Sequence, residues 1–116
     1  MTDIEILRAA AAYLKDRPKV VFTPYPNYDE RVIAALDTLP SDHEYLSHYE
    51  KLKDKAIRSM TLDDLATMYT FILRGERFCD GHIASFIEDG RLLELVDRHI
   101  ELLEKEKARR LPFFSR

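Results

Sequence analysis

Apolar residues recur every three or four positions along most of this chain, and this spacing predicts an all-α protein. Ile4, Leu7 and Leu14 begin the pattern, and Pro18 should end the first helix. The spacing continues in five later stretches. The helical stretches expected from the pattern are 3–17, 29–39, 42–56, 62–73, 81–88 and 91–109. We therefore expect one all-helical domain over residues 1–116, built as a single compact bundle of about six helices.

Capping residues locate several helix starts. Thr2 suits the first N-cap, and Thr61 with Asp64 forms a capping box before the fourth stretch. Ser41 with Glu44 has the same spacing, so a second capping box is expected before the third stretch. The fourth stretch is apolar on more than one face, which predicts a central and largely buried helix.

Residues 18–28 break the helical pattern. This segment is rich in aromatic and β-branched residues, but Pro24 and Pro26 exclude a long strand. We expect an aromatic, proline-rich extended loop with a short strand at 20–22. Such a loop either covers the core or closes over a pocket.

All three glycines and the only cysteine lie between Arg74 and Gly90. Gly90 suits the left-handed position that ends a helix, and Asp80 suits the N-cap of the 81–88 helix. Gly75 either breaks the central helix or lets a neighbouring segment approach closely. Cys79 is expected at a buried apolar junction, because free cysteine is often buried.

Charged residues crowd the same stretch, and unpaired charges are costly between apolar helices. The cluster consists of Arg74, Glu76, Arg77, Asp80 and His82. One interpretation is a structural ion-pair network between two helices. Another is a binding site for an anionic ligand, because arginine offers forked donors to carboxylate or phosphate. A third is catalysis by Cys79 as a nucleophile with His82 as its base.

The stretch RGERFCDGHIASFIEDGRLLELV carries a resemblance to a known family. Its R-x-E-R-F-C-D-G core spans Arg74–Gly81, and a second glycine follows at Gly90. This core resembles a signature of small uncharacterised bacterial and archaeal proteins, classed as a domain of unknown function. The resemblance covers about a third of the chain, from Thr61 to about Val96, and implies no activity.

The last helix has an apolar stripe with steps of three, four and three residues, at Leu93, Val96, Ile100 and Leu103. The stripe either faces the core or forms the seam of a homodimer. The end of this helix is basic. Its cationic residues either interact favourably with the helix dipole or form a docking patch. The basic residues are Lys105, Lys107, Arg109, Arg110 and Arg116.

Composition narrows the function classes. The net charge of −3 argues against nucleic-acid binding, and no apolar run is long enough for a membrane span. A single cysteine and the absence of a leader sequence favour a cytoplasmic protein. His43 and His48 are five residues apart, which does not suit a metal site. His99 is expected at a helix boundary, and His48 in a surface pair with Glu44.

No nucleotide-binding, metalloprotease or hydrolase motif occurs, and no cofactor or metal is expected. The leading prediction is therefore a non-catalytic protein-interaction or regulatory module. The alternative is a protein that binds a small anionic ligand, or an enzyme, with its site around Arg74–His82.

Overall fold

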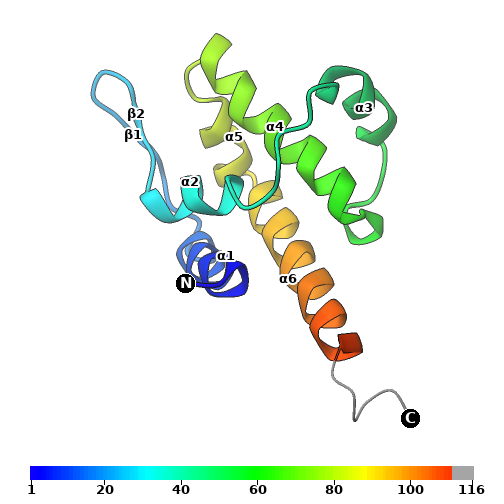
Figure 1. The fold of residues 1–116 in the computed structure, drawn as a ribbon. Coiled ribbons are helices and arrows are strands. Elements are labelled where there is room, and N and C mark those ends of the chain that lie inside the picture. The colour runs from blue at the N-terminus through cyan, green and yellow to red at the C-terminus, as the bar shows by residue number, and fades with distance from the viewer. Residues whose placement is uncertain (111–116) are drawn as a thin grey trace.

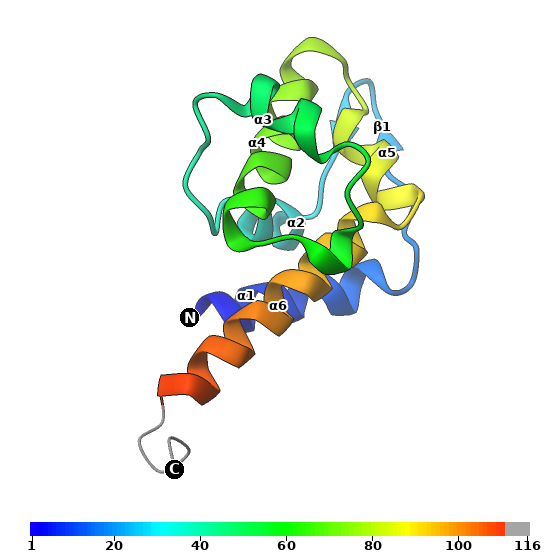
Figure 2. The ribbon, with the colours of Figure 1, turned by 90° about the vertical axis from the view of Figure 1, so that its right-hand side faces the viewer.

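The computed structural model describes residues 1–110 and confirms the all-α class (Figures 1 and 2). Six α-helices and one very small hairpin make up its regular structure over these residues, with a single 3-10 turn at Ile57–Ser59. The helices are α1 (Asp3–Leu14), α2 (Glu30–Leu36), α3 (Tyr45–Leu52), α4 (Leu62–Phe78), α5 (His82–Glu88) and α6 (Arg91–Arg110).

Local capping explains where α1 and α4 begin. The capping boxes at Thr2 and at Thr61 both form, with the threonine side chain accepting from the third helical N–H. The prediction of a capping box at Ser41 and Glu44 is wrong. Glu44 is itself the N-cap of α3, and its side chain makes no capping hydrogen bond. Asp42 instead accepts a hydrogen bond from the Glu44 backbone N–H at 3.0 Å.

The extended loop contains the expected short strand and a second one. β1 (Val21–Phe22) pairs antiparallel with β2 (Pro26–Asn27). Val21 and Phe22 are 61% and 48% exposed, so β1 does not cover the core. Tyr28, which follows the hairpin, packs partly against the core.

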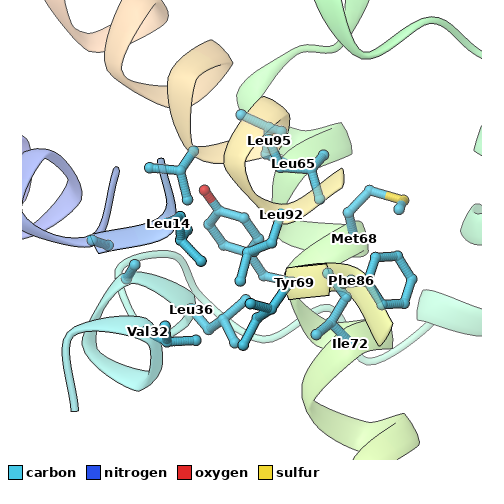
Figure 3. Close-up of a cluster of buried hydrophobic side chains, with 14 of the residues drawn as sticks. Leu14, Val32, Leu36, Leu65, Met68, Tyr69, Ile72, Phe86, Leu92 and Leu95 are labelled. Carbon is cyan, nitrogen blue, oxygen red and sulfur yellow. The ribbon is translucent and has the colours of Figure 1, made fainter. Parts of the chain in front are cut away.

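The core gathers around α4, as the sequence predicts. Figure 3 shows labelled side chains of α1, α2, α5 and α6 gathered around Tyr69 of α4, which is 1% exposed. Leu14 comes from α1, Leu36 from α2 and Leu92 from α6. Burial of this apolar surface is the main favourable contribution to folding.

Helix α6 packs alongside α1 (Figure 2), and Arg8 in α1 forms an ion pair with Glu104 in α6. The inward residues of α6 are Leu92, Leu95, Val96 and His99, all fully buried. Val96 therefore belongs to the core, whereas Leu93, Ile100 and Leu103 pack against it only in part. A homodimer through this stripe stays a prediction. Of the basic residues at this end, Arg116 lies outside the described residues.

His99 is fully buried, and the expectation of a boundary position is wrong. Its Nδ1 lies 2.9 Å from the Tyr69 hydroxyl, and its Nε2 has no partner among the described residues. Burial lowers the pKa of His99, while the charge of Asp3 opposes that shift. A tyrosine hydroxyl that donates to Nδ1 leaves Nε2 as the protonated nitrogen of a neutral ring.

Acid is therefore expected to destabilise the fold through His99. The unfolded state binds the proton at the usual pKa of about 6.5, before the folded state does. The contribution of His99 to stability should be constant above that pH and should fall below it by up to about 1.4 kcal/mol per pH unit for one proton. His82, whose pKa burial also lowers, adds a slope of the same sign. Urea unfolding at several pH values measures this slope. His99→Leu should reduce it, and an unchanged slope would contradict the assignment.

Candidate functional site

The structure divides the five charged residues of the predicted cluster between two places, a cavity beside α2 and the turn from α4 to α5. Arg74 and Arg77 line a cavity between α2 and α4. Glu76 lies toward α5 and contacts its first residues. His82 sits on α5 itself, and Asp80 lies exposed in the turn between the two helices. These residues are close together in the sequence, but α4 directs their side chains to different sides.

Glu76 organises the turn from α4 to α5. Its carboxylate accepts hydrogen bonds from the backbone N–H of Gly81 at 2.9 Å and of Ile83 at 2.8 Å. It also accepts a hydrogen bond from the Tyr28 hydroxyl at 2.7 Å. Asp80 therefore does not cap α5, contrary to expectation. The N-cap is Gly81, with a φ of 94°, and the capping carboxylate comes from the preceding helix.

Tyr28 connects the hairpin segment to the same turn. Its hydroxyl accepts a hydrogen bond from the Ala84 backbone N–H at 3.2 Å while donating to Glu76. Burial and the hydrogen bond to the Glu76 carboxylate raise the pKa of Tyr28. Glu76 and Tyr28 thus tie three segments of the chain together.

Gly75 lets α5 approach α4 closely, which was one of its two expected roles. A Cβ at Gly75 would lie 2.2 Å from Cδ2 of the His82 ring. The ring also makes edge contacts with Phe71 and Phe86. Burial lowers the pKa of His82, so the neutral ring is favoured. These contacts give His82 a packing role.

Glu76→Gln is expected to lower the free energy of unfolding by about 2 kcal/mol, because buried N–H groups that lose an acceptor cost about 1–3 kcal/mol. The amide keeps one carbonyl oxygen and presents N–H groups where an acceptor is needed. Chemical denaturation measures the loss. Glu88→Gln is the control, since within residues 1–110 Glu88 accepts only one hydrogen bond, from Val20 N–H, at an exposed position. Equal losses in the two variants would contradict this role for Glu76.

The outer side of the turn is exposed. Cys79 is a free, exposed thiol, so the expected burial at an apolar junction is wrong. Phe78 is 84% exposed. The Phe22 ring of β1 lies against the turn, because a Cβ at Gly81 would be 3.1 Å from its Cζ. Four large apolar side chains of the hairpin and the turn are each exposed, namely Val21, Phe22, Tyr25 and Phe78.

The cavity beside Arg74 and Arg77 has a volume of about 460 Å³. The end of α2 and the following loop form one wall, and α4 forms the other. Its lining residues are Leu36, Asp37, Leu39, Ser41, Thr70, Leu73, Arg74 and Arg77. We call it the α2–α4 cleft.

Neither arginine of this cleft pairs with a carboxylate of the described residues. The Arg74 guanidinium lies 5.7 Å from the centre of the Tyr45 ring, which holds it beside α3 by a cation–π contact. The expected ion-pair network is therefore not formed within residues 1–110. Arg74 and Arg77 lie one helical turn apart on α4, and both residues line the cleft.

A second cavity, of about 480 Å³, lies on the other side of the Leu39–Ser41 segment. Its wall contains Asp42, whose Oδ2 accepts from the Thr67 hydroxyl at 2.7 Å and lies 2.8 Å from Nδ1 of His48. These hydrogen bonds, that of Thr67 foremost, lower the pKa of Asp42. Sequence reasoning paired His48 with Glu44, whose Oε2 is 3.5 Å from Nε2, but missed Asp42.

Two further findings concern other kinds of site. Over residues 1–110, no set of three or more His, Cys, Asp or Glu side chains is arranged to hold a metal ion. Within the same residues, none of the helices has the length and apolar character needed to cross a membrane.

Comparison with known proteins gives one match. Residues 8–105 match a family of unknown function, DUF6508. No curated protein and no solved structure matches the chain. The match covers most of the chain, beyond the third on which the sequence resemblance was based. The chain therefore belongs to DUF6508, a family of unknown function.

Proposed function

We propose that this protein binds a small molecule with a carboxylate or phosphate group in the α2–α4 cleft. The observation that supports the proposal is that Arg74 and Arg77 both open onto this cleft without a carboxylate partner. This favours the alternative prediction from the sequence, an anionic ligand, over an ion-pair network.

The chemistry of the cleft fits such a ligand. Each guanidinium presents two parallel N–H donors that match the two oxygens of a carboxylate or phosphate. Arg74 is half-buried and positioned by Tyr45, so part of the entropy cost of ordering its side chain is already met by the fold. The volume of about 460 Å³ lies within the usual range of ligand pockets, which is about 300–1,000 Å³.

The test is thermal unfolding with 4-methylpentanoate at millimolar concentrations. The midpoint of the wild-type protein should rise with ligand concentration, because binding to the folded state adds stability. Arg77→Ala should lose about 2 kcal/mol of binding free energy, the worth of a charge-assisted hydrogen bond, and so show little rise.

Arg31→Ala is the matched control, because Arg31 is an exposed arginine already paired with Asp29 at 2.8 Å. It should respond to ligand as the wild type does. A midpoint that rises equally in Arg77→Ala and Arg31→Ala would show an effect of the solution and would overturn the proposal. So would a midpoint that does not change in the wild type.

A second candidate is the non-catalytic interaction module that leads the sequence-based predictions. The exposed aromatic residues of the hairpin and the turn favour it, because Tyr25 and Phe78 are 68% and 84% exposed, and burial of such side chains against a partner is favourable. Lys19, two residues before β1, and Asp80, two residues after Phe78, are exposed charges of opposite sign. A surface with both signs can pair with its own copy about a two-fold axis, so the partner proposed is a second copy of this chain.

Sedimentation velocity over a range of concentrations tests this candidate. The wild type should dimerise as concentration rises, and Phe78→Ser should remain monomeric. Leu103→Ser is the matched control on the α6 stripe. A wild type that is monomeric throughout would overturn self-association, and loss of the dimer only in Leu103→Ser would place it on α6 instead.

A further inference from the structure

We infer that the ligand of the α2–α4 cleft is a zwitterion, an amino acid with an apolar side chain. This inference rests on the proposed anion-binding function and names its ligand class. It comes from three kinds of residue that line one cavity: the cationic Arg74 and Arg77, the anionic Asp37, and a set of leucines.

Asp37 is the decisive residue. It follows the last residue of α2, on the wall that faces α4, and its side chain has no ion pair or hydrogen bond within residues 1–110. The cleft therefore contains two cations and one anion that do not pair with one another. Charges of both signs therefore remain available at one cavity to a ligand that itself carries both signs.

A free amino acid carries both a negative and a positive charge, which complement the arginines and Asp37. Its carboxylate would accept hydrogen bonds from Arg74 and Arg77, and its ammonium would donate to Asp37. Ser41 also lines the cleft, and its hydroxyl makes no hydrogen bond within the described residues, so it offers a further polar contact. The Thr70 hydroxyl does not, because it donates to the Ala66 carbonyl and accepts from the Asp42 N–H.

Leucines provide the apolar part of the cleft. Leu36 is almost fully buried, and Leu39 and Leu73 are half-buried beside the cavity. An apolar side chain that displaces water from them gains about 0.8 kcal/mol for each buried CH₂ group. This wall favours a branched aliphatic side chain over a polar one.

The same features disfavour other anions. Asp37 repels a phosphate dianion, which has no positive group to offset the repulsion. A nucleotide would need aromatic faces for its base, whereas no aromatic residue lines this cleft within residues 1–110. An amino acid meets all three features of the site.

The experiment is isothermal titration calorimetry with three ligands that share the same branched aliphatic group. L-leucine carries both charges, 4-methylpentanoate lacks the ammonium and 3-methylbutylamine lacks the carboxylate. L-leucine should bind at least about tenfold more tightly than either of the others, because each lacks one charge-assisted contact.

Two variants separate this inference from the function on which it rests. Asp37→Asn should weaken the binding of L-leucine about tenfold, and it should leave the binding of 4-methylpentanoate unchanged or make it tighter. Arg77→Ala should weaken the binding of both L-leucine and 4-methylpentanoate. Asp37 is exposed, and circular dichroism melting should show that Asp37→Asn keeps the fold.

Each contrary result has a distinct meaning. If 4-methylpentanoate binds the wild type as tightly as L-leucine, and Asp37→Asn changes neither, the zwitterion is wrong and the anion site stands. If neither ligand binds, or if Arg77→Ala changes neither affinity, the anion site is wrong as well. Binding of 3-methylbutylamine as tight as that of L-leucine would assign the cleft to a cation and overturn both.

Discussion

Val96→Glu is expected to lower the free energy of unfolding by about 4 kcal/mol, because it places an unpaired carboxylate in the core. Val96 has no exposed surface, and it lies on α6 between Leu95 and the helical turn that carries His99. Domains of this size are stable by only about 5–15 kcal/mol, so the loss is large. Urea denaturation followed by circular dichroism measures it.

Leu103→Glu is the matched change on the same stripe. Leu103 is half-buried and contacts only the edge of the core, so its loss should be about 1 kcal/mol. The pair separates the two interpretations of the stripe. A Val96→Glu variant that keeps wild-type stability would show that α6 does not pack as described, and would leave the stripe free for a homodimer.

Gly75→Ala is expected to cost about 2–3 kcal/mol, although alanine in a helix interior is favoured over glycine by about 1 kcal/mol. The new methyl group would overlap the His82 ring at 2.2 Å. The ring cannot move aside easily, because Phe71 and Phe86 contact it. Either the ring or the whole of α5 must shift. Chemical denaturation measures the loss.

Gly90→Ala is the control for this change. Gly90 has a φ of 86°, but nothing lies within 4 Å of the position of its Cβ. Its cost should come only from left-handed backbone strain, about 1–2 kcal/mol. If Gly75→Ala is as stable as the wild type, the close approach of α5 to α4 is not tight, and Gly75 has no packing role.

Helix boundaries could be predicted from the sequence where the capping residue lies within one turn of the helix that it caps. Thr2 and Thr61 are such residues, and both capping boxes form. Ser41 had the same spacing, yet the segment is held by Asp42, which bonds to Thr67 on α4. A tertiary contact replaced the local one there, and spacing alone carries no information about it.

The turn between α4 and α5 shows the same limit. Gly75 and Gly90 were predicted from backbone conformation or close approach, and both roles are confirmed. The cap of α5 was assigned to Asp80, the nearest carboxylate in the sequence, but it comes from Glu76. Glu76 reaches α5 only because the chain reverses direction, and that reversal is a property of the fold.

For a related reason, the sequence could not predict which of the charged side chains share a site. Arg74, Glu76 and Arg77 are neighbours along the chain, but residues two positions apart point to different sides of a helix. The helix therefore directs Glu76 to α5 and the arginines to the α2–α4 cleft. Asp37, which shares that cleft, comes from a distant part of the chain and was not predicted to be part of the site.

The most direct test of the account is to observe the arginine side chains during ligand binding. The Nε–Hε resonances of Arg74 and Arg77, assigned from Arg→Lys variants, can be followed by NMR as 4-methylpentanoate is added. We predict that both shift together and reach saturation. Arg31 and Arg91, already paired with Asp29 and Asp89, should not shift. Shifts of Arg74 and Arg77 no larger than those of Arg31 and Arg91 would contradict the proposal that this cleft binds anions.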